Sequence, residues 1–316
     1  MTISIGADPE FFLYDPQAAG PDEGEEPDVD ESGDYIEPEA PGYVPCVGLI
    51  PGTKENPHQL EGPPGFFCHE DNVCLEVGFP PTDNPRIFVD NVQMVKRLVQ
   101  EQFLDTLGYQ LAIVPSNMFR SDQLTSTQAR TAGCEPDYDA YTSGKARTIQ
   151  SQLMASNIRF AGGHIHLGGD FNCPPFVVAL FADIFLSLRF MGDSGKKTLG
   201  TPNGSSFYCP DWKKRAVWYG QPGIFRTKPY GIEYRTPSNW WCRSNRPARS
   251  MANSATILCQ FLENNNATKL RSMVRNIDWL AVQSFLSNPP MNLKERTNKQ
   301  DMLYTECLAH MARDEV

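Results

Sequence analysis

The chain has 316 residues, of which 40% are hydrophobic, so it can bury a large core as one large domain or as two smaller ones. The formal net charge of −10 comes from one segment, because residues 15–44 contain eleven acids and no lysine or arginine. The remainder is nearly neutral, which argues against a basic face for nucleic acid and against a generally acidic surface.

The cysteine and hydropathy patterns narrow the class of protein further. Nine scattered cysteines, an odd number with no CxxC pair, argue against a disulfide framework or a zinc knuckle. No basic and apolar leader opens the sequence. The longest apolar stretch, residues 175–190, is too short to span a bilayer comfortably and includes Asp183 and Arg189. We therefore expect a reduced, soluble, cytoplasmic protein with no membrane contact.

The first predicted element is a strand over residues 2–14, which carries Asp8 and Glu10 two residues apart. Pro9 lies between them and favours an edge or a bulged position. Residues 15–44 are rich in proline, glycine and acids, and they predict a mobile insertion.

Short strands and turns are predicted from residue 46 to residue 82. Lys54 follows a Gly-Thr turn, where it could meet a phosphate or could be an ordinary surface lysine. An evenly spaced polar series leads to Glu76, and period two would turn all its members to one face of a strand. The series is Glu70, Asn72, Cys74 and Glu76.

The second half of the sequence mixes both kinds of element. Residues 157–168 predict a strand with His164 and His166, and residues 231–241 begin as a strand with Glu233 and Arg235. Capping residues and apolar spacing predict helices over residues 85–107, 175–191, 248–264 and 268–286, with a short helix near the end.

Strands and helices are mixed without a β–α–β rhythm, so the predicted fold class is α+β, with an antiparallel sheet and helices on one side of it. We predict a single domain over residues 1–316. It would contain the acidic insertion at 15–44 and a helical C-terminal part at about 245–316.

Four predicted strands offer charged or histidine side chains on one face. A single acid–base pair on a sheet could be a cross-strand ion pair. Four such strands cannot line an apolar core, because burying an unpaired charge costs roughly several kcal/mol of folding free energy. They could instead line a funnel that holds metal ions and phosphate.

The types of side chain indicate a hard cation. The pair His164 and His166 is weak by itself, because such pairs also occur in cupins, in metal-dependent hydrolases and in plain structural strands. The chain has only five histidines, and the other residues of the predicted face are carboxylates, which suit Mg²⁺ or Mn²⁺. Arg215, Arg226 and Arg235 lie nearby in sequence, and guanidinium groups match phosphate oxygens. Metal ions and arginines in one cleft predict phosphoryl transfer.

Four motifs in order closely resemble the phage carboxylate–amine ligases, or amidoligases, of the glutamine synthetase and glutamate–cysteine ligase-like superfamily. The motifs are GADPEFF, NVCLEVGFPPT, GGHIHLGG and YGIEYRTPSNWW. The resemblance extends from Ile5 to about residue 290, with 15–44 as an insertion. It implies a glutamine synthetase-like antiparallel β-sheet funnel with helices on its outer face, and the host cytoplasm as the location of a phage protein.

The resemblance implies a set of metal ligands. They are Asp8, Glu10, Glu70, Glu76, His164 and Glu233. The first acid of the family's usual glutamate pair is aspartate here, which shortens one ligand arm. The acid that accompanies Glu76 is less clear, because Glu70, Asp71 and Asn72 are alternatives, and even spacing favours Glu70.

The resemblance also implies the residues that meet substrates. His166 matches the histidine on the substrate side, and Arg235 matches the arginine that contacts phosphate or the acyl phosphate. Arg215 and Arg226 are candidates for the remaining phosphate-binding arginines, and Lys54 is a further candidate for contact with ATP.

The implied reaction joins a carboxylate to an amine in two steps. ATP phosphorylates the carboxylate with help from Mg²⁺ or Mn²⁺ and the arginines, and the amine then attacks the acyl phosphate and releases phosphate. The expected partners are ATP and small-molecule or peptide substrates. The alternatives are a guanidino kinase, a metal-dependent hydrolase that uses the histidine pair, and a non-catalytic virion or host-binding protein that retains the fold.

Overall fold

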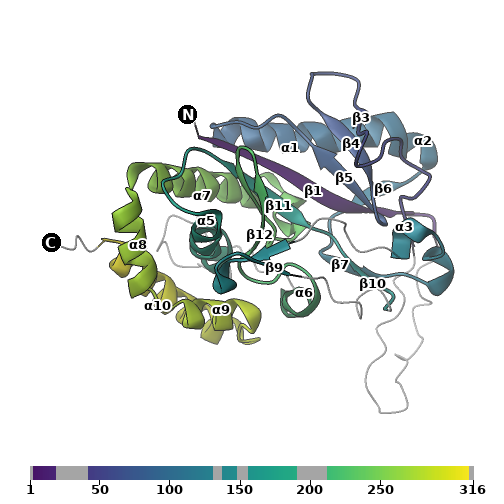
Figure 1. The fold of residues 1–316 in the computed structure, drawn as a ribbon. Helices are drawn as coiled ribbons and strands as arrows, with labels where there is room; N and C mark the ends of the chain where they lie inside the picture. The colour runs from purple at the N-terminus through teal and green to yellow at the C-terminus, as the bar shows by residue number, and fades with distance from the viewer. Residues whose placement is uncertain (1–2, 19–41, 131–136, 148–155, 191–211, 313–316) are drawn as a thin grey trace, which may run out of the picture.

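The strand β1 (Ser4–Tyr14) lies inside the main sheet and pairs with neighbouring strands on both sides. The computed structural model describes residues 3–18, 42–130, 137–147, 156–190 and 212–312. Within these ranges, helices and an open antiparallel sheet form an α+β structure, which confirms the predicted fold class (Figure 1).

Eleven strands of the described ranges belong to the main sheet. In spatial order its path is β3 (His58–Gln59), β4 (Phe67–Asp71), β5 (Cys74–Gly78), β1, β11 (Gly163–Gly168), β13 (Gly231–Tyr234), β12 (Ile224–Lys228), β8 (Asp137–Asp139) and β9 (Lys145–Arg147). Two further strands, β2 (Tyr43–Val44) and β6 (Gln110–Ala112), pair with the end of β1.

The predicted strand over residues 157–168 is divided in the structure. Its first part, β10 (Ile158–Phe160), pairs with β7 (Ser116–Met118) in a separate two-stranded sheet, and only β11 joins the main sheet. A close approach of two chain segments accompanies the division, because a Cβ on Gly163 would lie 2.3 Å from the carbonyl oxygen of Ser238. Only glycine fits there.

Alternation along β1 separates an apolar face from a polar face. Ile5, Ala7, Phe11 and Leu13 are buried in the main hydrophobic core, whereas Asp8 and Glu10 lie on the opposite face. The neighbouring strands keep the same order, and their core residues include Leu75, Val77, Ile165, Leu167, Ile232 and Tyr234. The main core therefore lies on one side of the sheet, and a smaller apolar cluster that includes Phe12 lies on the other.

Pro9 does not lie in an edge strand, because β1 is central. It pairs with Gly163 at the end of the ladder between β1 and β11. On the other side of β1, the ladder with β5 begins at Glu10, and the bridge from Ile5 to Thr82 lies further back. The missing N–H of Pro9 falls in the interval between these two pairings, which explains why a proline is tolerated inside the sheet.

Three helices cover the apolar face of the sheet (Figure 1). They are α1 (Pro85–Val99), α5 (Pro175–Ala182) and α7 (Asn245–Asn264). Asn84 caps α1 by accepting a hydrogen bond from the backbone N–H of Arg86 at 2.9 Å, as its sequence predicts. The helix continues through a π-helical turn into α2 (Asp105–Leu107), and Gly108 ends it with φ of +75°.

Shorter helices occupy other positions along the chain. They are α3 (Thr127–Arg130) and α6 (Trp212–Trp218). The C-terminal helices, drawn in yellow-green in Figure 1, lie together beyond α5 and α7. They are α8 (Ala267–Asn276), α9 (Trp279–Ser287) and α10 (Leu293–Ala312).

The structure corrects two details of the predicted C-terminal part. The single helix predicted over residues 268–286 is two helices, because Asp278 accepts a hydrogen bond from the N–H of Ala281 at 3.0 Å and caps a new one. The final helix, predicted as short, has 20 residues.

Most of the predicted insertion over residues 15–44 lies outside the described ranges. No helix among the described residues is long and apolar enough to cross a membrane.

Candidate functional site

Strand register brings the predicted site residues of the polar face side by side. Asp8 pairs with His164 across β1 and β11, and His166 pairs with Glu233 across β11 and β13. Glu10 pairs with Glu76 across β1 and β5. Directly opposed residues of an antiparallel pair point to the same face, so the register confirms that these side chains share one face.

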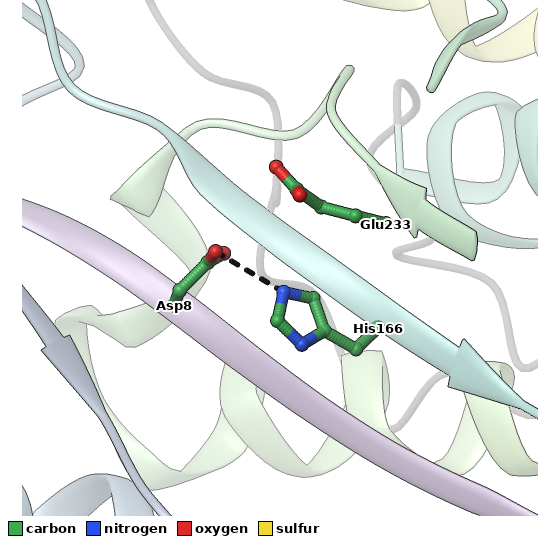
Figure 2. A group of neighbouring side chains, drawn as sticks. All are labelled: Asp8, His166 and Glu233. Atoms are coloured by element: carbon green, nitrogen blue, oxygen red, sulfur yellow. Dashed lines mark ion pairs between the residues drawn. The ribbon is translucent and has the colours of Figure 1, made fainter. Parts of the chain in front are cut away.

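The first carboxylate cluster consists of Asp8, His166 and Glu233, which come from three adjacent strands (Figure 2). One potential ligand atom from each of them lies within 4.8 Å of the other two. His166 Nε2 lies 3.1 Å from Asp8 Oδ2, and the hydroxyl of Tyr230 lies 3.0 Å from His166 Nδ1. The buried Oδ1 of Asp8 has no hydrogen-bond partner among the described residues.

Basic groups surround the first cluster and keep its acids ionised. Burial opposes the charge on Glu233, but the adjacent Arg235 guanidinium lowers the pKa of Glu233 to about 2. Burial also opposes the charge on Asp8, yet the adjacent His166 holds its pKa well below the usual range. Lys228 Nζ lies 2.9 Å from Glu233 Oε2, and Arg226 Nη1 lies 3.9 Å from Glu233 Oε1.

The second carboxylate cluster consists of Glu10, Asp71 and Glu76, whose ligand atoms also lie within 4.8 Å of one another. Burial raises the pKa of Glu76 well above its usual range, and the charges of Asp8, Asp71 and Glu10 raise it further. Burial likewise raises the pKa of Glu10, although Gly162 N–H donates to its Oε2 at 2.7 Å. Three like charges in a small buried volume favour either a proton or a bound cation.

The structure corrects the choice of Glu70 as the acid that accompanies Glu76. Residues 70–76 are not one strand, because a hairpin turn with Asn72 at φ of +62° separates β4 from β5. The register sets His69 opposite Glu76 and Glu70 opposite Leu75, so Glu70 faces the other side and accepts a hydrogen bond from the N–H of Gly48. Asp71, an alternative that sequence left open, occupies the cluster.

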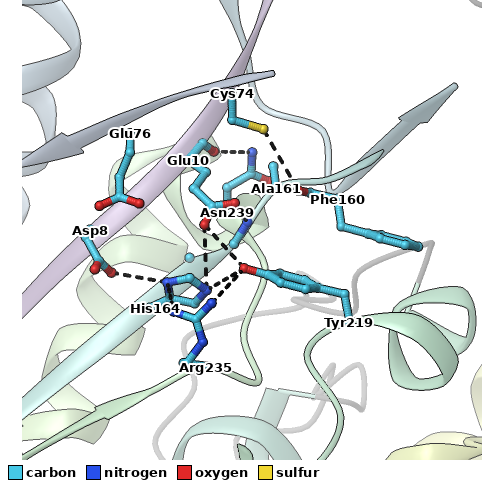
Figure 3. A network of polar contacts seen from close by, with 12 residues as sticks. Asp8, Glu10, Cys74, Glu76, Phe160, Ala161, His164, Tyr219, Arg235 and Asn239 are labelled. Carbon is cyan, nitrogen blue, oxygen red and sulfur yellow. Dashed lines mark hydrogen bonds and ion pairs between the residues drawn. The ribbon is translucent and has the colours of Figure 1, made fainter. Parts of the chain in front are cut away.

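A polar network lies between the two clusters and joins them (Figure 3). His164 is 1% exposed, and its Nδ1 lies 3.4 Å from Asp8 Oδ1 and 3.5 Å from Glu233 Oε1. Its Nε2 lies 3.1 Å from the hydroxyl of Tyr219 and 3.8 Å from Glu10 Oε1. Tyr219 also donates to Glu10 Oε1 at 3.3 Å, so one hydroxyl contacts both sides of the site.

Arg235 and Arg226 face the site, as their positions in sequence predict. Arg235 donates to Glu233, approaches His164 Nδ1 at 3.2 Å and donates to the Tyr219 hydroxyl at 3.1 Å. Its Nε lies 3.2 Å from Asp137 Oδ1, and Arg226 Nε donates to the same oxygen at 2.9 Å. Asp137 therefore fixes both guanidinium groups beside the first cluster.

Arg215 has different surroundings from the other two arginines. It is 2% exposed, and its guanidinium donates to the backbone carbonyls of Ala161 at 2.9 Å, Pro115 at 3.3 Å and Pro237 at 3.4 Å. It also lies 5.2 Å from the ring centre of Tyr219. These contacts favour a structural role for Arg215 over contact with phosphate.

Lys54 and His69 both act on Glu76 of the second cluster. Lys54 is exposed, and its charge is one of those that act on Glu76. His69 is buried opposite Glu76, with 3.4 Å between His69 Nε2 and Glu76 Oε1. Burial lowers the pKa of His69, which favours a neutral ring.

Sequence reasoning did not identify several members of the site. These residues are Asp137, Tyr219, Tyr230 and Lys228. Lys228 is two residues from Arg226 in a strand, so period two could have revealed it. Tyr219 follows a helix and reaches the site only through the tertiary fold, so no local pattern marks it.

The arrangement offers two groups of oxygen and imidazole ligands with arginines directly beside one of them. Oxygen-rich ligand sets suit Mg²⁺ and Mn²⁺, and guanidinium groups match phosphate oxygens. Comparison with protein-family models and with curated proteins finds no significant match to this chain. The chemistry of the site is therefore inferred from its residues and from the motifs.

Proposed function

We propose that the protein is an ATP-dependent ligase that joins a carboxylate to an amine, of the amidoligase kind that its motifs resemble. The observation that carries the proposal is the pair of carboxylate clusters on one sheet face, with Arg235 between Glu233 and His164. The open antiparallel sheet with a polar inner face and helices behind it supports a glutamine synthetase-like funnel as the finer fold.

The residues of both clusters fit hard divalent cations such as Mg²⁺ or Mn²⁺. Asp8 Oδ1 is buried without a hydrogen-bond partner among the described residues, and the carboxyl groups of Glu10 and Glu76 repel each other. Asp8, His166 and Glu233, with His164 beside them, would hold one cation, and Glu10, Asp71 and Glu76 would hold another. Bound cations would neutralise these carboxylates and the phosphate oxygens of ATP.

The side chains of this chain would then position the reacting groups. The site can bring the γ-phosphoryl group of ATP and the substrate carboxylate together beside Arg235 and Arg226, whose charges suit the phosphoryl oxygens. The carboxylate oxygen attacks phosphorus, and ADP leaves. The amine nitrogen next attacks the acyl carbon, the bond from that carbon to the phosphate oxygen breaks, and an amide and inorganic phosphate form after loss of a proton from nitrogen.

Competing interpretations have less support from the site. A hydrolase centred on the histidine pair would require imidazole-rich coordination, whereas carboxylates outnumber imidazoles across the two clusters. A protein that only retained the fold would have no need of Asp137 to hold two buried arginines against the carboxylate face. A location in the cytoplasm, with ATP and small-molecule or peptide substrates, belongs to the same proposal.

Activity in a mixture of candidate substrates tests the proposal. The purified protein, Mg²⁺ and ATP are incubated with a metabolite and peptide extract, and mass spectrometry searches for products lighter by one water than the sum of two precursors. We expect such a product together with ADP and phosphate, and no product with the variant Asp8→Asn. Products without ATP, or ADP without a new amide, would contradict a ligase.

A further inference from the structure

The hydroxyl of Tyr219 lies at the centre of the network between the two clusters (Figure 3). Tyr219 follows the end of α6, and its ring stacks on Phe160 with 6.2 Å between ring centres and an interplanar angle of 6°. The guanidinium of Arg215 lies over the ring of Tyr219, with its Cζ 5.2 Å from the ring centre. Phe160 and Arg215 thus hold the ring from outside the two clusters, and the His164 ring lies 6.2 Å from it between ring centres.

The hydrogen bonds of this hydroxyl can be assigned from donor and acceptor chemistry. A phenolic hydroxyl donates once and accepts twice, and a guanidinium group can only donate. Arg235 Nη2 donates to the hydroxyl at 3.1 Å, and the hydroxyl donates to Glu10 Oε1 at 3.3 Å. One acceptor position remains, and His164 Nε2 is the group that lies next to it, at 3.1 Å.

The same logic indicates which nitrogen carries the hydrogen in a neutral His164 ring. Arg235 Nη1 lies 3.2 Å from His164 Nδ1, and because a guanidinium group cannot accept, Nδ1 must provide the lone pair. The hydrogen of a neutral ring is then on Nε2, where it meets the remaining acceptor position of Tyr219. The assignments at both nitrogens agree with each other.

We propose that Tyr219 is a positioning residue that keeps His164 in the Nε2–H tautomer. The lone pair of Nδ1 is thereby directed at the space that Asp8 Oδ1 and Glu233 Oε1 border, at 3.4 and 3.5 Å from the nitrogen. His164 would present Nδ1 to a cation, whereas His166 would present Nε2, because Tyr230 lies against Nδ1 of His166. The relevance of this tautomer to catalysis rests on the proposed function. The tautomer itself does not.

The two tyrosines provide a matched pair of variants. Tyr219→Phe removes the hydroxyl that contacts His164, and Tyr230→Phe removes the one that contacts His166. Both changes delete a single oxygen from a ring near the first cluster. An effect on His164 that follows Tyr219→Phe alone is therefore not a general result of losing a phenol near the site.

The test is nitrogen NMR of the full chain labelled with ¹⁵N-histidine, recorded without metal or ATP. The five histidines give a simple spectrum, and the variant His164→Gln identifies the signals of His164. We expect the wild-type ring to show the Nε2–H pattern, Tyr219→Phe to show a mixture of tautomers, and Tyr230→Phe to leave the His164 signals unchanged. In a parallel titration followed by electron paramagnetic resonance, Tyr219→Phe should bind Mn²⁺ about tenfold more weakly.

An Nδ1–H pattern for His164 in the wild-type protein would overturn the proposal, and so would an unchanged His164 tautomer in folded Tyr219→Phe. If Tyr219→Phe does not fold, the wild-type spectrum still decides between the two tautomers. If the tautomer responds as expected but the wild-type protein neither binds Mn²⁺ nor forms amide, the positioning role of Tyr219 stands and the proposed ligase function fails.

Discussion

The two carboxylate clusters contain the same kinds of acid on the same face of one sheet, yet their acids have opposite tendencies to ionise. In the first, Arg235, Lys228 and Arg226 contact Glu233, and the pKa of Glu233 falls to about 2. In the second, no described lysine or arginine forms an ion pair with Glu10, Asp71 or Glu76, and burial raises the pKa of Glu76.

The difference shows that the charged side chains around each cluster, and not the types of acid in it, decide whether its carboxyl groups are ionised in the metal-free protein. The first cluster is partly neutralised by cationic groups of the protein itself. The second has no ion pair with a lysine or arginine of the described residues, so a proton or a bound cation would relieve most of its repulsion. We therefore expect one substitution, glutamate to glutamine, to have opposite effects on the stability of the metal-free protein in the two clusters.

The largest effect on stability is expected for Glu233→Gln. The change removes one of the two carboxylates that pair with buried Arg235, the other being Asp137, and removing one partner of a buried ion pair costs about 3–5 kcal/mol. Chemical denaturation at pH 8 without metal measures the loss. Because the pKa of Glu233 is lowered on folding, its stabilising contribution is present above its unfolded pKa and disappears as the pH falls toward about 2. The difference between variant and wild type should shrink over that range, and a gap independent of pH would contradict the ion-pair explanation.

Arg235→Lys tests whether the guanidinium of Arg235 contributes to the reaction as well as neutralising the charge of Glu233. Lysine keeps the positive charge but loses the fork that reaches Glu233, His164 and Tyr219 together. We expect a folded protein that binds Mg²⁺ and ATP but forms amide more slowly by about a hundredfold, or ~3 kcal/mol in activation free energy. Initial rates at saturating ATP measure kcat, and Lys228→Arg, which keeps a cation beside Glu233, serves as the comparison. Turnover near that of the wild type would limit Arg235 to a structural role.

Gly162→Ala should disturb the boundary between the clusters. A Cβ at this position would lie 2.3 Å from His164 Nε2 and 3.0 Å from Glu10 Oε1, so both side chains would have to move. Overpacking of this kind costs about 1–3 kcal/mol. Thermal denaturation gives the loss of stability. Gly48→Ala is a control for the steric part, because a Cβ on Gly48 meets no atom within 4 Å, although its φ of +75° carries strain of its own. Equal losses in both variants would show that crowding at the site is not the cause.

The smallest effect, and the one with opposite sign, is expected for Glu76→Gln. Glutamine removes one of the buried like charges, so the metal-free protein should gain about 1 kcal/mol at pH 8. The pKa of Glu76 is raised on folding, so the wild-type protein loses stability as the pH rises from its unfolded pKa through the folded one. The gain should therefore be small near pH 4 and grow toward pH 8. The same variant should bind Mn²⁺ more weakly. If Glu76→Gln is instead less stable than the wild type and binds Mn²⁺ equally well, the proposed difference in ionisation between the two clusters is contradicted.

The sequence by itself determined which face of each strand carries the polar groups. Side chains two residues apart share a face wherever the backbone is extended, so Asp8 with Glu10, and His164 with His166, were placed together by local geometry. The cap at Asn84 and the helix after it were likewise local. These features depend only on nearest neighbours along the chain.

Only the tertiary structure decided which further residues join those polar faces to form the site. The turn at Asn72 changed the face of Glu70 and put Asp71 beside Glu76, and a turn of one residue more or less reverses every side chain that follows it. Asp137 and Tyr219 reach the site from segments far away in the chain, where spacing contains no information about contact. The protonation of the carboxyl groups followed from the same long-range packing, because the pKa of a carboxyl group depends on its burial and on the charges around it. The fold brings those charges together from distant parts of the chain, so spacing along the sequence does not reveal them.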